Sequence, residues 1–180
     1  MQEADRLQRE LEATMDGDPW YGSAVGRILD GVDASSAAAY PINGAHSIWE
    51  LVLHMTAWVN EVRRRLDGGR HRDPAEGDWP AVTATTEDAW KQAAASLRQA
   101  HAEIRRTLAP MDDADLQCQV GGSQVDADGN RVTLYQTVIG ILQHDAYHAG
   151  QIALLKKALT RTGFNGVANH GQRSGLRNDS

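Results

Sequence analysis

One local pattern restricts the fold of this chain more than any other. It is the capping box S/T-x-x-E/Q, in which two side chains bind backbone N–H groups and so start a helix. Ser47 with Glu50 and Thr133 with Gln136 fit this pattern, and residues 85–88 are a weaker relative of it. The boxes predict helices over residues 47–66 and 133–159, and a third helix that starts near residue 85 and ends before Pro110. Together these long helices favour an all-α fold.

Two further helices are predicted nearer the N-terminus. Asp18-Pro19 places a capping carboxylate before a proline at a first helical position, which predicts a helix over residues 19–29. The acidic amphipathic segment 2–15 predicts an additional helix before it. In the helix that starts near residue 85, one stripe of positions at alternating spacings of three and four is typical of a packed face. This stripe consists of Trp90, Ala94, Leu97, His101, Ile104 and Leu108.

Long connections separate these helices. Residues 67–84 are rich in Gly, Pro and Asp; ~18 extended residues span ~60 Å, whereas a helix of ~20 residues is ~30 Å long. This connection can recross the molecule, so helices adjacent in sequence need not be antiparallel. In the connection over residues 111–132, residues 125–132 predict a small hairpin that turns at Asp128-Gly129. We expect one bundle domain over residues 1–160 and a C-terminal tail over 161–180, either flexible or ordered by a neighbouring subunit.

The charge balance argues against nucleic acid as a partner. The chain has 18 Lys and Arg against 24 Asp and Glu, a formal net charge of −6, whereas phosphate recognition favours a basic excess. Cys118 is the single cysteine, so an internal disulfide is impossible, and the N-terminus lacks the regions of a signal peptide. No apolar run approaches the ~18 residues of a membrane span. We therefore expect a cytoplasmic protein without a nucleic-acid or membrane partner.

The chemical signal is a group of histidines. His144 and His148 lie four residues apart, which places them on one helix face with Cβ atoms ~5–6 Å apart. Their neighbours are apolar, and burying two unpaired imidazoles costs stability unless a partner such as one metal ion satisfies both. His54 becomes a third ligand if its helix faces theirs, and three protein ligands plus an open position are typical of a catalytic metal site. The alternative is that each ring forms hydrogen bonds of its own.

Several residues near these histidines have two interpretations. Glu50 precedes His54 by one turn and could orient it, although completion of the capping box is the favoured role. Gln151 follows His148 by three residues and could contact a water on the metal. Trp58 could line a pocket or pack in the core.

Other candidates rank lower. His101 lies on the apolar stripe and could approach the site, but a core histidine with an ordinary partner is favoured. Residues 144–148 differ by one residue type from the zinc-protease motif H-E-x-x-H, in which Asp145 would be the general base, but no downstream third ligand is evident. We expect the three remaining histidines to be exposed, namely His46, His71 and His170.

Three segments carry a resemblance to a known family. Residues 17–22 (GDPWYG), 46–54 (HSIWELVLH) and 144–152 (HDAYHAGQI) make the chain similar to the DinB-like, or DinB/YfiT-like, metalloenzymes. The most specific feature is one histidine in an earlier helix followed by H-x-x-x-H in a later one, and the resemblance extends to about Leu159. It implies a four-helix bundle with long crossover connections and up-down-down-up connectivity.

The resemblance also implies a site and a chemistry. His54, His144 and His148 would bind a divalent metal ion, zinc or nickel, in a pocket at one end of the bundle of a homodimer. Some relatives transfer or isomerise with a low-molecular-weight thiol such as mycothiol or bacillithiol. We therefore expect a metal-dependent thiol S-transferase or hydrolase that acts on a small molecule, with catalytic residues unassigned. The alternative is a non-catalytic, stress-related bundle protein whose metal is structural or incidental.

Overall fold

The computed structural model describes residues 2–122, 129 and 131–161, and the regular elements in these ranges are all helices. This confirms the all-α prediction. The four long helices are α1 (Glu3–Asp16), α4 (Ile48–Leu66), α5 (Glu87–Leu108) and α7 (Leu134–Arg161). The short ones are α2 (Val25–Leu29), α3 (Ala34–Ala37) and α6 (Asp113–Leu116). The predicted hairpin falls largely on 123–128 and 130, and the predicted tail on 161–180, so both lie outside the described residues apart from their edges.

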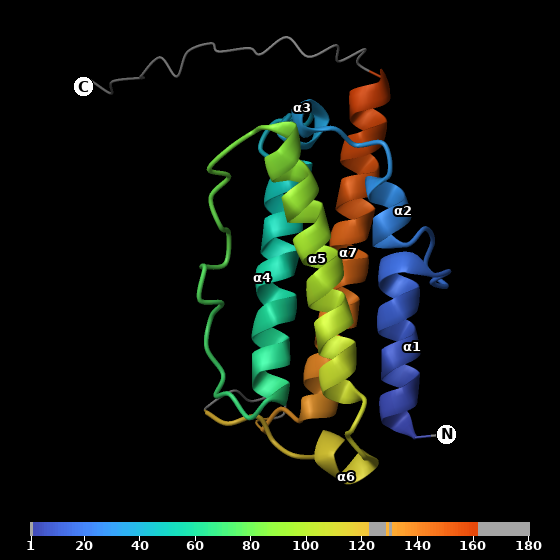
Figure 1. Cartoon of the computed structure of the whole chain (residues 1–180), viewed down its shortest axis with the longest axis vertical. Helices are drawn as coiled ribbons and strands as arrows, with labels where there is room; N and C mark the ends of the chain where they lie inside the picture. Colours follow the sequence, from blue (N-terminus) through green and yellow to red (C-terminus); the bar gives the residue numbers. More distant parts are fainter. Residues whose placement is uncertain (1, 123–128, 130, 162–180) are drawn as a thin grey trace, which may run out of the picture.

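The long helices lie side by side in a bundle. α4 packs against α5 and α7, and α1 packs against the same two helices. Figure 1 shows α1 and α7 running upward and α4 and α5 running downward. The parallel direction of α4 and α5 follows from the connection of residues 67–86, which returns outside α4 to the opposite end of the bundle (Figure 1). α4 and α7 are therefore antiparallel neighbours, and the candidate functional site lies between them.

The capping boxes form as the sequence predicts. Ser47 Oγ accepts a hydrogen bond from the backbone N–H of Glu50 at 3.1 Å, while Glu50 accepts one from the N–H of Ser47 at 2.7 Å. Thr133 and Gln136 form the same reciprocal pair at 3.1 and 2.8 Å. The N-cap of α5 is Thr86, one residue later than the weaker box predicted. Each box satisfies N–H groups that have no partner within the helix.

The predicted helix over residues 19–29 is wrong in its first half. Only Val25–Leu29 is helical, and its N-cap, Ala24, has no side-chain cap. The N–H of Gly22 donates to the carbonyl of Pro19 at 3.2 Å, and Gly22 has a φ of +144°, which ends any helical path. Asp-Pro starts a turn here, a role it also favours. The segment predicted as an additional helix, α1, is instead the first long helix of the bundle.

The core divides into two apolar clusters along the bundle axis. One contains Met55, Leu97 and Ala149, and the other contains Val59, Ile104 and Ile141. Asp145 and His148 of α7 fall between the two clusters, whereas His54 of α4 lies next to Met55 of the first cluster and His101 of α5 next to Ala100 of the second. Together with the half-buried His144, these residues form a polar layer where the two clusters meet.

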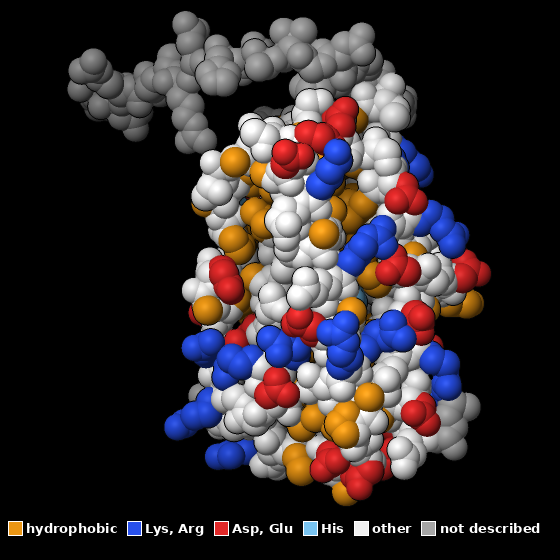
Figure 2. All heavy atoms as spheres, in the orientation of Figure 1, with side chains coloured by type: hydrophobic (Ala, Val, Ile, Leu, Met, Phe, Trp, Pro, Cys, Tyr) orange, Lys and Arg blue, Asp and Glu red, His pale blue; other side chains and the backbone are white. Residues whose placement is uncertain are grey.

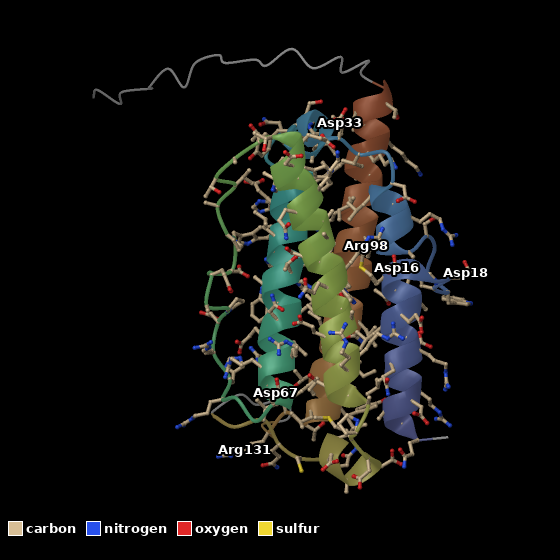
Figure 3. All side chains as sticks on the ribbon, in the orientation of Figure 1. Asp16, Asp18, Asp33, Asp67, Arg98 and Arg131 are labelled. Carbon is tan, nitrogen blue, oxygen red and sulfur yellow. The ribbon has the colours of Figure 1, made fainter. Side chains whose placement is uncertain are left out.

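Ion pairs border the packing of α1 on α5. Figure 3 shows Arg98 of α5 and Asp16 at the end of α1 pointing toward each other, and they form an ion pair. Arg105 and Glu12 form another at 2.8 Å. Charged side chains of both signs are spread over this face, with hydrophobic side chains between them (Figure 2). Within the ranges described, no helix combines the length and apolar character that crossing a bilayer requires.

Candidate metal centre

The three histidines predicted as ligands converge in the polar layer. His54 comes from α4, and His144 and His148 come from consecutive turns of α7. One ring nitrogen of each lies within 4.8 Å of the others, and the Nε2 atoms of His54 and His144 are 2.9 Å apart. The condition that the two helices face each other is therefore met. These three residues could hold a metal ion.

The other ring nitrogen of each histidine faces an oxygen. His54 Nδ1 donates to the backbone carbonyl of Asp78 at 2.6 Å. His148 Nδ1 donates to Gln151 Oε1 at 2.9 Å, and His144 Nδ1 lies 3.5 Å from Asp145 Oδ1. A carbonyl oxygen can only accept, so Nδ1 of His54 and of His148 carries the proton and Nε2 of each presents a lone pair. Metal-ligating histidines in proteins show this same arrangement.

Two arrangements satisfy the close pair of Nε2 atoms on His54 and His144. A proton on His144 Nε2 lets this atom donate to His54 Nε2 at 2.9 Å, since His144 Nδ1 has no hydrogen-bond partner among the described residues. That hydrogen bond does not include His148, whose Nδ1 contacts Gln151. A divalent metal ion would satisfy all three rings at once, as imidazole donors prefer.

Asp145 lies behind His144, not on the metal side of the cluster. It is completely buried, and its other oxygen, Oδ2, lies 3.2 Å from Nε2 of His101, which is also buried. Asp145 therefore does not occupy the position of a zinc-protease general base. Burial alone would raise the pKa of Asp145, but the neighbouring rings of His101 and His144 outweigh it and lower the pKa below its usual range. The sequence-based expectation that His101 has an ordinary partner in the core agrees with this contact.

The connection between α4 and α5 covers the site, and the sequence analysis missed this contribution. Trp79 stacks on His54 with ring centroids 3.9 Å apart, and on its other face it stacks on His46 at 3.6 Å. The side chain of Asp78 accepts a hydrogen bond from Trp58 Nε1 at 2.7 Å. Two adjacent residues of the connection thus orient His54 and shield it from water. The only signal in the sequence is a large aromatic residue in a segment rich in Gly, Pro and Asp.

The remaining residues that the sequence marked as candidates lie around the histidine cluster. Glu50 caps α4 and also accepts from the hydroxyl of Tyr40 at 3.0 Å, so the capping role holds. Gln151 orients His148 through Nδ1, which corrects the expectation that it faces a water on the metal. Trp58 is half-buried and lines a cavity beside His144.

Of the two described histidines that were expected to be exposed, His46 is exposed and His71 is not. His46 stacks on Trp79 at the edge of the site. His71 is half-buried, because its backbone N–H donates to the carbonyl of Gly121 at 2.7 Å and holds the connection against the segment before α7. His170 lies outside the described residues.

Burial keeps two of the rings in the form that a metal needs. It lowers the pKa of His148 to about 4, and the proximity of His144 and His54 adds to this effect. Burial also lowers the pKa of His54. Both rings are therefore neutral near pH 7, and a neutral imidazole is the state that binds a metal ion.

The site lies at the middle of the bundle and not at one end, as the family resemblance had implied. His54 is six residues from the start of α4, and His144 is ten residues from the start of α7, or about 9 and 15 Å along the helix axes. Apolar clusters fill the bundle on both sides. Entry from the end of the bundle is therefore blocked, and a small molecule must approach from the side.

Comparisons with known proteins agree with this architecture. A family model described as the DinB superfamily matches residues 23–152, which include all three histidines. Searches of curated proteins and of solved structures returned no match. The match covers well over half of the chain and spans both helices that carry the histidine cluster. The chain belongs to the DinB superfamily.

Proposed function

We propose that this protein is a metal-dependent enzyme that acts on a small molecule through His54, His144 and His148, as a thiol S-transferase or a hydrolase. One observation carries the proposal: one ring nitrogen of each of these histidines lies within 4.8 Å of the others, while Nδ1 of His54 and of His148 is held by an oxygen. Three protein ligands leave a coordination position open, which is typical of catalytic sites. Zinc and nickel are the candidates, because imidazole suits both.

A divalent metal ion held there supplies Lewis acidity, which lowers the pKa of a coordinated thiol or water. The protein's own residues supply the rest. Asp78 and Gln151 hold the rings of His54 and His148 through Nδ1, and Asp145 lies behind the ring of His144. Trp79 covers His54 and excludes water from one side of the cluster. We assign no general base.

Elemental analysis of the purified protein tests the proposal. We expect one equivalent of a transition metal in the wild-type protein and loss of that metal in His54→Ala. His46→Ala is the matched control, because His46 lies one ring away beyond Trp79 and outside the cluster. Activity assays with low-molecular-weight thiols then follow on the metal-loaded protein. Full metal occupancy in His54→Ala would remove the site from consideration.

A second candidate is a non-catalytic bundle protein whose metal stabilises the fold. The burial of the polar layer between two apolar clusters favours it, because a cation there would satisfy buried polar groups. The two candidates differ in ligand access. A metal-loaded protein whose spectrum does not change on addition of a small thiol has no open position, and this outcome supports the structural role.

The family resemblance supports further proposals about the setting of this chemistry. They are homodimeric assembly, a low-molecular-weight thiol as cosubstrate, a cytoplasmic location, and one bundle domain over residues 1–160 followed by a tail over 161–180. Sedimentation equilibrium of the full chain tests the first of them, and limited proteolysis near residue 160 tests the last.

A further inference from the structure

We infer that the exposed face of α7 binds a second copy of this chain, with the two α7 helices antiparallel about Tyr147. This inference rests on the homodimeric assembly in the proposed function and names its surface, but it does not depend on a bound metal. The exposed residues in the middle of α7 recur at alternating spacings of three and four and form one narrow row, the α7 stripe. They are Gly140, Gln143, Tyr147, Gly150 and Leu154. This spacing is typical of a helix that packs along its length against another helix.

The α7 stripe carries no charge. Between Leu134 and Leu155 the only Asp, Glu, Lys or Arg is Asp145, which is completely buried. Two copies of this chain have the same net charge of −6 and repel each other, so contact between them is favoured where no charged side chain is exposed. The core of a protein interface is also depleted of charge and enriched in Tyr. Charge therefore favours a second copy, because a strongly charged partner would find no complementary group on the stripe.

The stripe has the shape that a twofold pairing requires. Tyr147 and Leu154 protrude, with exposed fractions of 67% and 59%. A Cβ atom built on Gly140 would meet no atom within 4 Å, so the surface has a gap there. Leu154 follows Tyr147 by seven residues and Gly140 precedes it by seven. In an antiparallel pairing about Tyr147, Leu154 of each copy therefore faces Gly140 of the other, and the contact is the same on both sides.

A parallel pairing of the same helices fits less well. It would place Gly140 against Gly140 and Leu154 against Leu154, which leaves a void at one end and crowding at the other. Close packing disfavours both. The order of the protruding residue and the gap along the stripe thus selects the antiparallel arrangement.

The pairing also brings the second copy close to the histidine cluster. Gly140 lines the cavity between α4 and α7, and so does His144, whose side chain is 25% exposed. Leu154 of the partner subunit faces Gly140 in the antiparallel pairing and therefore borders this cavity. A small molecule that enters the cavity from the side would meet residues of both copies.

Sedimentation equilibrium of the full chain over a range of concentrations tests the inference. A phosphine reductant prevents the exposed Cys118 from linking two chains. We expect a dimer of twice 19.6 kDa. Leu154→Glu should raise the Kd of the dimer at least about tenfold, because it would bury a carboxylate without a partner. Gly140→Lys should have a similar effect from the facing position, and lysine is the better helix former, so the variant should fold.

Two further variants make the test specific. Ala95→Glu is the matched control, because Ala95 is exposed on α5 and its replacement adds the same charge away from the stripe. Its dimer should have the Kd of the wild type. The double variant Gly140→Lys, Leu154→Glu places opposite charges face to face in the antiparallel pairing. Its dimer should be at least about tenfold tighter than that of either single variant, the size of a close charge pair at an interface.

Each outcome has a defined meaning. A wild type that stays monomeric rejects a second copy as the occupant, and a dimer that Leu154→Glu weakens no more than Ala95→Glu does rejects the stripe as the interface. Weakening in both single variants without recovery in the double variant rejects the pairing about Tyr147.

Zinc analysis of the same samples separates this inference from the metal chemistry. Leu154→Glu should retain the zinc content of the wild type, and His54→Ala should remain dimeric. A monomer that binds zinc would overturn the inference and leave the metal-dependent function standing. A dimer through the stripe that binds no metal would overturn that function alone.

Discussion

Replacing Asp145 with asparagine is the most direct test of how the bundle holds its histidines. The carboxylate faces a histidine ring on each side, with Oδ1 3.5 Å from His144 Nδ1 and Oδ2 3.2 Å from His101 Nε2. Asparagine keeps the shape but has one acceptor oxygen, so its NH₂ group must face one of the two rings. Either His144 or His101 then faces an NH₂ group in place of a negatively charged oxygen.

The structure sets the size of the expected effect. Loss of an outer-shell carboxylate costs about 10–100-fold in metal affinity, which corresponds to about 1.4–2.8 kcal/mol. A buried polar group left without a partner lowers the free energy of unfolding of the metal-free protein by about 1–3 kcal/mol. We expect Asp145→Asn to show both effects. His101→Gln should destabilise the fold but weaken metal binding less, because His101 contacts the carboxylate and not the ligand.

Competition with a chromophoric chelator measures the zinc affinity, and urea unfolding of the metal-free protein measures the stability. Asp30→Asn is the control, since Asp30 is exposed at the end of α2. A zinc affinity for Asp145→Asn within a factor of two of the wild type would refute the reasoning. The position of His144 would then be set by helix packing alone, and the polar layer would have no role in metal binding.

Three further perturbations have defined outcomes. Zinc at a free concentration of 100 times its Kd should stabilise the protein by about 2.7 kcal/mol. Differential scanning fluorimetry should then show a rise in Tm of about 5–10 °C, which a chelator should reverse. A Tm that does not change with zinc would contradict the metal site. Glu61→Gln should lower the free energy of unfolding at pH 7 by about 1.5–3 kcal/mol. Burial raises the pKa of Glu61, but Arg64 and Arg65 have a larger effect in the opposite direction, so the pKa lies below its ordinary value of 4.5. The stabilisation by Glu61 is therefore present above about pH 4.5 and is lost as the pH falls through the folded-state pKa. Urea titrations should show that the difference in free energy of unfolding between Glu61→Gln and the wild type becomes smaller in acid. A difference that does not depend on pH would contradict this prediction. Trp79→Ala should weaken zinc binding about two- to tenfold, the value of an aromatic stack, whereas the fully exposed Trp20→Ala should have no effect; equal effects of the two would exclude a covering role for Trp79.

The helix starts show where local sequence patterns succeed and where they fail. The capping boxes at Ser47 and Thr133 could be predicted because both partners lie within four residues of each other, so their geometry needs no other part of the chain. Asp18-Pro19 carries an equally local signal, but the same dipeptide also starts turns. The outcome depended on Gly22, whose positive φ completes the turn and delays the helix to Val25.

The features of the site likewise divide into those that local sequence predicts and those that it does not. The shared face of His144 and His148 follows from the helical period alone. Whether His54 joins them depended on α4 facing α7, which the long connection made possible but did not require. The position of the site along the bundle, where two apolar clusters meet, also could not be predicted from local patterns. It depends on the lengths of helices whose ends lie far apart in the chain.

The helix class, the helix starts and the spacing of the histidine pair can be predicted from the order of the residues, because the interactions that determine them act within one or two helical turns. The surroundings of the three histidines cannot be predicted in this way. The acceptor for His54 is the main-chain carbonyl of Asp78. Every residue has such a carbonyl, so the identity of residue 78 does not predict this contact. Asp145 and His101 lie on different helices and meet across the centre of the bundle. Such contacts arise only when side-chain packing brings distant segments together, and that packing converts three separate histidines into one candidate centre.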